Sequence, residues 1–148
     1  MKRSERMQTV ERVVSDVEKK RAEALAARER YVTECENKLQ ELESYQKSYA
    51  DQFQTRAGAG IGAAGLRDFQ TFMVRLGEAV KQQTQLIAKA KADRDAERSV
   101  WQHAAQRAGA VGGLVKRWQK EEQYQQDRQD QRDSDERAQR ISRPSLNN

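Results

Sequence analysis

The chain has 148 residues, of which 34% are charged, 36% hydrophobic and 6% aromatic, and its 28 basic and 23 acidic side chains leave a formal net charge of +5. A charged, aromatic-poor chain of this length cannot bury a thick core, so the composition excludes an ordinary globule and leaves disorder or long helices with a narrow apolar stripe. Basic and acidic residues are interleaved, which indicates a solvated helix surface, and we expect no nucleic-acid partner.

Several classes of site and segment are also disfavoured. The single cysteine, Cys35, and the single histidine, His103, are expected to lie far apart, so we expect no metal site and no cofactor. Two paired helices offer no concave pocket for desolvating carboxylates, so we expect no catalytic residues and no enzyme activity. The N-terminal residues MKRSERMQ lack the apolar segment of a secretory signal. No apolar run approaches the roughly 20 residues of a transmembrane segment.

The first arm, from about residue 5 to 56, carries the heptad pattern of a coiled-coil helix, with one break in phase near Lys38. Acid-before-base pairs four residues apart, such as Asp16 and Lys20, further favour helix. The predicted core positions are Met7, Val10, Val14, Val17, Arg21, Ala24, Arg28, Tyr31 and Cys35, then Leu39, Leu42, Gln46, Tyr49 and Phe53.

The segment GAGIGAAG, residues 58–65, matches the dinucleotide-binding pattern G-x-G-x-x-G. A dinucleotide loop must follow a strand and open a helix, and no strand pattern occurs in this chain. Glycine costs about 1 kcal/mol relative to alanine inside a helix and adopts positive φ freely. The cluster therefore predicts a turn near residues 57–65 that reverses the chain.

The second arm, from about residue 66 to 138, has an unbroken heptad pattern. Its predicted core positions are Leu66, Phe69, Met73, Leu76, Val80, Gln83, Ile87, Ala90, Arg94, Glu97, Trp101, Ala104, Ala108, Val111, Val115 and Trp118. Gly109, Gly112 and Gly113 provide either a hinge or room for close packing. Beyond Trp118 the pattern has no apolar face, which indicates either a solvated helix or a segment that orders on a partner.

These elements predict an all-α fold in which the two arms form an antiparallel coiled-coil hairpin, a single domain over residues 1–148 with a disordered tail at about 141–148. The numbers of facing residues should sum to roughly 120, in arms about 70 Å long. Glu97 would then lie near Arg21 in a polar layer, unless both side chains extend into solvent. The turn permits either a monomer or an arm-swapped dimer.

Three apolar or small residues, Phe72, Ala79 and Leu86, lie outside the predicted core of the second arm at seven-residue intervals. They either widen the hydrophobic core or form a strip that another protein binds.

Late in the second arm stand Trp101 and the run Leu114-Val115-Lys116-Arg117, and the Gln-rich C-terminal extension contains Asp135-Glu136-Arg137-Ala138. With these residues on a short antiparallel coiled coil, the whole chain resembles the flagellar export protein FliJ family. The resemblance implies a cytoplasmic stalk of the flagellar type III export apparatus, similar in form to the rotary-ATPase γ subunit and peripherally associated with the inner face of the cell membrane. Such a stalk docks into the export ATPase ring and promotes its assembly.

The partners implied by the resemblance are the flagellar export ATPase (FliI-like) and its regulator, the membrane export gate protein (FlhA-like) and export chaperones. The export-gate contact would fall on Phe72, Leu76 and Ala79. The ATPase-ring contact would fall on Met7, Val10, Arg12, Val115 and Trp118. Two alternatives remain: the equivalent stalk of a virulence type III secretion system, and a nucleic-acid-binding or scaffolding coiled coil that uses Arg117, Trp118 and Lys120.

Overall fold

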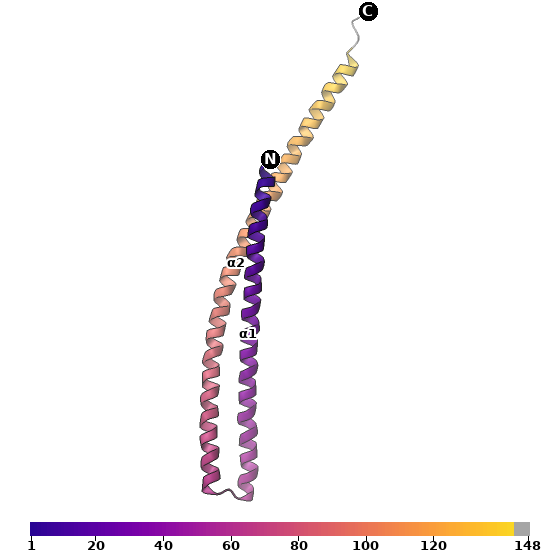
Figure 1. The fold of residues 1–148 in the computed structure, drawn as a ribbon. Coiled ribbons are helices and arrows are strands. Elements are labelled where there is room, and N and C mark those ends of the chain that lie inside the picture. Colours follow the sequence, from indigo (N-terminus) through magenta and orange to yellow (C-terminus); the bar gives the residue numbers. More distant parts are fainter. Residues whose placement is uncertain (144–148) are drawn as a thin grey trace, which may run out of the picture. The chain divides into compact units, whose positions relative to one another are not determined.

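The computed structural model describes residues 1–143, which form two long helices joined by one short connection (Figure 1). Helix α1 spans Arg3–Ala59 and helix α2 spans Ala63–Ser142. The two helices pack against each other, and no strand occurs within residues 1–143. The predicted all-α helical hairpin is confirmed.

The connection is shorter than the glycine cluster suggests. Both helices extend into the predicted turn, so only Gly60, Ile61 and Gly62 lie outside helix. Gly60 has a φ of 92°, the one positive φ among the described residues, and its N–H donates to the carbonyl of Ala57 at 3.3 Å. The N–H of Leu66 donates to the carbonyl of Gly62 at 3.1 Å and so starts α2. Of the four glycines in the cluster, only Gly60 is required by its backbone conformation.

The C-terminal end of α2 reaches further than expected. The helix continues through Ile141 to Ser142, where the sequence predicts a disordered tail. The rest of that predicted tail, residues 144–148, lies outside the described residues.

The described chain divides into two compact units. The first unit combines Met1–Lys19 of the N-terminal segment with α2 from His103 onward. Ser4 and Val115, each 3% exposed, are its buried residues. Near the middle of this unit Gly112 approaches α1: a Cβ added to it would lie 3.6 Å from the Glu11 carboxylate.

The second unit spans Lys20–Gln102 and contains the turn. Its buried hydrophobic residues are Val32, Cys35, Leu76, Ile87 and Ala90.

Polar contacts also cross between the helices of the second unit. The Gln83 side-chain amide donates to the backbone carbonyl of Cys35 at 2.8 Å. Ion pairs join Arg28 to Asp93 at 3.9 Å and Arg98 to Glu29 at 3.7 Å. Exposed pairs contribute little energy, but together these contacts agree with the predicted register, in which facing residue numbers sum to roughly 120.

The predicted core of α2 is confirmed along nearly its whole length. The exception is Leu66 beside the turn, which is 41% exposed. All other predicted core positions are buried or half-buried, namely Phe69, Met73, Leu76, Val80, Gln83, Ile87, Ala90, Arg94, Glu97, Trp101, Ala104, Ala108, Val111, Val115 and Trp118.

The predicted core of α1 is partly wrong in its N-terminal half: Met7, Val14, Ala24 and Cys35 are buried or half-buried as predicted, but Arg21 and Arg28 are exposed. Val10, Val17 and Tyr31 are 44%, 46% and 42% exposed, and the residue after each of them faces α2 instead. An uninterrupted seven-residue series is buried or half-buried, namely Ser4, Glu11, Glu18, Leu25, Val32, Leu39, Gln46 and Phe53. The phase break predicted near Lys38 is therefore absent, because Glu11, Glu18 and Val32 hold the core positions that the sequence predicts for Val10, Val17 and Tyr31.

Candidate functional site

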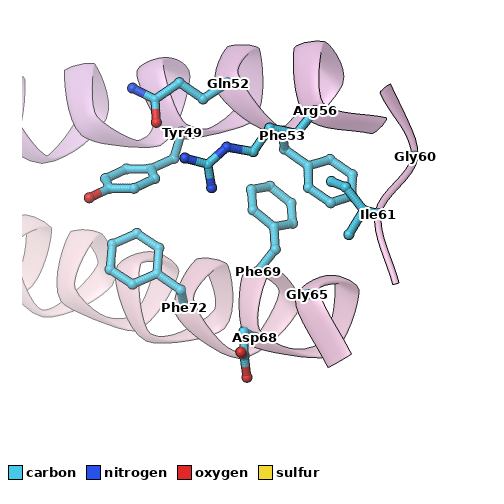
Figure 2. Close-up of a pocket in the computed structure, with 10 residues that line it drawn as sticks. All are labelled: Tyr49, Gln52, Phe53, Arg56, Gly60, Ile61, Gly65, Asp68, Phe69 and Phe72. Atoms are coloured by element: carbon cyan, nitrogen blue, oxygen red, sulfur yellow. The ribbon is translucent and has the colours of Figure 1, made fainter. Parts of the chain in front are cut away.

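The helix ends beside the turn form a cavity of about 660 Å³ in the second unit (Figure 2). Two aromatic pairs connect α1 to α2 there. The rings of Phe53 and Phe69 stack with centroids 3.9 Å apart, and those of Tyr49 and Phe72 lie 4.5 Å apart at 51°. The cavity is lined by Tyr49, Gln52, Phe53, Arg56, Gly60, Ile61, Gly65, Asp68, Phe69 and Phe72.

The turn contributes directly to this cavity. Ile61 points back from the connection toward the stacked phenylalanines (Figure 2). Gly65 leaves room for it, because a Cβ at Gly65 would lie 2.8 Å from the Ile61 Cγ2. Arg56 extends its guanidinium along α1 toward Tyr49, whereas Asp68 points away from the aromatic pairs (Figure 2). The site is thus an aromatic surface bordered by one cation, which suits an apolar group of a binding partner.

The three residues predicted for the export-gate contact lie on one side of α2. Phe72 is 39% exposed and Ala79 is half-buried, but Leu76 is only 9% exposed and belongs to the core. Phe72 is therefore the residue of this set that offers a large apolar surface. Leu76 lies beneath that surface and supports it.

The sequence prediction missed the contribution of α1 to this surface. Tyr45 and Tyr49 are 57% and 39% exposed, and Tyr49 contacts Phe72. Tyr31 and Tyr45 hold the heptad position before the core residues of α1, as Phe72 and Leu86 do on α2. The correct phase of α1 would have indicated these tyrosines.

One flank of the second unit is thus richer in aromatic groups than the other. The hydrogen bond from Tyr31 to Cys35 raises the pKa of the Tyr31 phenol, and the nearby carboxylates of Glu34 and Asp93 add to this effect. Asp93 belongs to α2, so its charge acts on Tyr31 from the other helix, although Tyr31 itself is 42% exposed. The other flank instead carries charged residues, such as the ion pair between Glu29 and Arg98. The exposed aromatic flank is the stronger candidate for protein binding.

The residues predicted for the ATPase-ring contact lie in the first unit, where they differ in accessibility. Arg12 is exposed and Val10 is 44% exposed. Met7 and Trp118 are half-buried, and Val115 is 3% exposed. Arg12 and Val10 therefore offer the accessible surface, whereas Val115 packs between the helices.

The start of α1 is attached to α2 by a cluster of polar contacts that the sequence prediction also missed. The backbone N–H of Ser4 donates to the Glu122 carboxylate at 3.1 Å, and the Ser4 hydroxyl donates to its other oxygen. Arg3 forms an ion pair with Glu121 at 2.7 Å and lies 4.1 Å from the ring centre of Trp118. The sequence could have indicated this contact, because Glu122 occupies the next core position of the heptad pattern after Trp118.

This cluster, which we call the terminal clamp (Arg3, Ser4, Trp118, Glu121 and Glu122), serves as a helix cap. The first N–H groups of a helix lack intrahelical partners, and the Glu122 carboxylate accepts one of them. The hydrogen bonds from Ser4 lower the pKa of the Glu122 carboxyl, and the charges of Lys2 and Arg3 lower it further.

Within residues 1–143, no group of three or more histidine, cysteine, aspartate or glutamate side chains could hold a metal ion. Over the same part of the chain, neither helix contains a segment apolar and long enough to span a membrane.

Comparison with known proteins identifies a matching family. The family model described as "Flagellar FliJ protein" matches residues 2–146. The chain matches no curated protein and no solved structure.

Proposed function

Because the family model covers nearly all of it, the chain belongs to the flagellar FliJ family and is a component of the flagellar type III export apparatus, and we propose that it acts there as a non-enzymatic stalk. In this proposal it docks into the export ATPase ring, promotes ring assembly and activity, and links the ring to the membrane export gate and to export chaperones. It would work in the cytoplasm, at the inner face of the membrane.

The observation that carries the gate contact is the exposed aromatic surface of the second unit. Phe72 is 39% exposed although it lies against Tyr49, and Tyr45, one helical turn before Tyr49 on α1, is 57% exposed. Aromatic side chains that remain accessible on a rigid helix pair are the usual anchors of protein interfaces. We assign Phe72 as the anchor, with Tyr45 and Tyr49 completing the surface and Leu76 and Ala79 supporting it.

Binding of the soluble part of the flagellar export gate protein tests this assignment. Phe72→Ala should weaken binding at least about tenfold, with helicity unchanged, since loss of an aromatic hot-spot residue costs about 2 kcal/mol or more. Val74→Ala is the matched control, because Val74 is 62% exposed on the same helix but follows the core residue Met73 instead of preceding it. Equal affinity of the Phe72→Ala and parent chains would exclude this contact.

The proposed ring contact rests on the first unit, where α1 and α2 are joined by the terminal clamp. Arg12 and Val10 present a cation and an apolar side chain from α1, about two helical turns after the clamp residue Ser4. Such a combination suits a partner surface that is apolar with acidic residues at its edge. Val115 and Met7 would act by holding the two helices together.

ATP hydrolysis by the purified flagellar export ATPase, titrated with this protein, tests the stalk role. We expect saturable stimulation together with ring formation, measured as an increase in particle mass. Arg12→Ala should raise the concentration needed for half-maximal stimulation several-fold, whereas Lys47→Ala, an exposed change in the second unit, should not. Stimulation of a virulence-type secretion ATPase but not of the flagellar one would instead favour the alternative apparatus.

A further inference from the structure

The turn of the second unit places positive charge beside an apolar cavity. Residues 52–67 contain two arginines, Arg56 and Arg67, and no acidic residue. Arg56 lines the cavity and directs its guanidinium toward Tyr49, whereas Asp68, which also lines it, points away from the aromatic pairs (Figure 2). Among residues 1–143 the Arg56 guanidinium forms no ion pair. Its charge is therefore available to an anionic group from outside the chain.

The apolar part of the cavity consists of aromatic rings from both helices. Phe53 and Phe69 stack with ring centroids 3.9 Å apart, so a ligand must lie against the outside of this stack. Tyr49 and Phe72 extend the aromatic surface, with centroids 4.5 Å apart. The cavity volume of about 660 Å³ lies within the range of small-ligand pockets, about 300–1,000 Å³. The cavity is therefore large enough for an apolar side chain of a partner.

The turn is shaped to complete this cavity. Ile61 is half-buried and points toward the stacked phenylalanines (Figure 2). A Cβ at Gly65 would lie 2.8 Å from the Ile61 Cγ2, although the φ of Gly65 is not positive. Gly58 and Gly62 have neither a positive φ nor an atom within 4 Å of an added Cβ. Gly65 is therefore required for the position of Ile61 at the cavity wall, because close packing tolerates no such overlap.

We infer that the cavity binds a partner segment in which an apolar side chain lies next to a carboxylate. The apolar side chain packs on the aromatic rings and on Ile61, and the carboxylate pairs with the Arg56 guanidinium. A guanidinium presents a planar fork of donors that matches both oxygens of a carboxylate. Arg56 determines specificity, because an uncharged apolar segment gains only the packing.

The identity of the partner rests on the proposed function, since Phe72 lines the cavity and is the proposed anchor of the gate contact. The inference adds two requirements that the Phe72 anchor alone does not impose. The gate protein must supply a carboxylate beside its apolar side chain, and the turn must hold Ile61 in place.

Two small probes, phenylacetate and phenylacetamide, test the recognition without the gate protein. Both contain a phenyl group, and only phenylacetate carries a carboxylate. In the full-length chain we expect phenylacetate to shift the amide NMR signals of Gly60, Ile61 and Gly65 with an affinity several-fold higher than that of phenylacetamide. Equal affinities for the two probes, or no shift with either at millimolar concentration, would overturn the inference.

The two arginines of the turn provide a matched pair of variants for this experiment. Arg56→Gln should abolish the preference for phenylacetate. Arg67→Gln removes the same charge and should preserve the preference, because Arg67 does not line the cavity and its Nε donates to the Ala63 carbonyl of its own helix at 3.4 Å. A cation in the last turn of α1 also stabilises that helix end, so the helicity of both variants is compared with that of the parent. Loss of the preference in both variants alike would contradict a specific role of Arg56.

Binding of the soluble part of the export gate protein tests the identity of the partner. Arg56→Gln should weaken this binding several-fold at low salt and less at high salt, because salt screens an exposed charge. Gly65→Ala should also weaken it several-fold by displacing Ile61, whereas Gly62→Ala should not. Weaker binding by Phe72→Ala but not by Arg56→Gln would overturn the inference and leave the proposed gate contact in place. Unchanged binding by both variants would exclude both.

Discussion

At the scale of single residues, the buried carboxylate of Glu97 lowers the stability of the folded chain. It occupies a core position of α2 in the second unit, and its Oε2 atom is buried without a hydrogen-bond partner among the described residues. The sequence predicts that Arg21 lies near it, but Arg21 is exposed, and no ion pair joins the two. The neighbouring arginines Arg94 and Arg98 pair with Asp95 and Glu29 instead. A buried, unpaired carboxylate oxygen loses hydration without compensation.

Glu97→Leu should therefore stabilise the protein, by about 1–3 kcal/mol if the full desolvation cost is removed. The measurement is the urea midpoint, with the slope of the unfolding curve checked for change. Glu23→Leu, at an exposed position of α1, is the control and should change stability by less than about 0.5 kcal/mol. A lower midpoint for Glu97→Leu would show that this carboxylate stabilises the helix pair.

For Glu122, in contrast to Glu97, we predict that removing the charge destabilises the protein. Its pKa is lower in the folded chain than the ordinary value of 4.5, so the folded state binds fewer protons than the unfolded state. Its contribution is present above the ordinary pKa and is lost as the pH falls through the folded-state pKa. Glu122→Gln should lower the melting midpoint by a few degrees at neutral pH, and the difference from the parent should shrink in acid.

Melting curves from about pH 7 to about pH 3 provide this measurement. Glu136→Gln, in the exposed part of α2, is the matched control and should leave the midpoint unchanged throughout. A Glu122→Gln difference that stays constant with pH would contradict the role of the charged carboxylate.

At the scale of elements, the C-terminal part of α2 is a helix without a covering partner. Residues 123–143 are exposed. Four glutamine amides each donate to an aspartate one turn later, in the pairs Gln123–Asp127, Gln126–Asp130, Gln129–Asp133 and Gln131–Asp135. Each such pair stabilises a helix by about 0.2–0.5 kcal/mol, so local contacts support this segment in place of tertiary packing.

A chain that ends at Gln126 should consequently melt at the same temperature as the parent. A chain that ends at Gln119 should melt several degrees lower, because it also lacks Glu121 and Glu122 of the terminal clamp. Circular dichroism at both truncations measures this difference. Equal loss in the two chains would mean that the exposed segment stabilises the first unit.

The stability of the turn depends mainly on one residue, Gly60. Gly60→Ala places a side chain at a φ of 92° and should cost roughly 1–2 kcal/mol. Gly62→Ala meets no atom within 4 Å and has no positive φ, so it should be neutral or slightly stabilising. Urea unfolding of the two variants measures both effects, and similar midpoints would argue against a special role for Gly60.

For the whole molecule, the short connection decides how the arms pair. Three non-helical residues return the chain directly to α1, so α2 of the same chain is at a high effective concentration. We therefore expect a monomer of 17.0 kDa by light scattering at micromolar concentration. A stable species of twice this mass would indicate exchange of arms between two copies.

The sequence alone determined the helical class, the position of the turn, the register and the core of α2, because long heptad patterns and clustered glycines have few structural solutions. It did not determine the phase of α1, where valines and glutamates compete for adjacent core positions. Nor did it identify the Ser4–Glu122 cap or the unpaired oxygen of Glu97. Those features depend on which atoms the other helix places opposite them, and only the tertiary structure decides that.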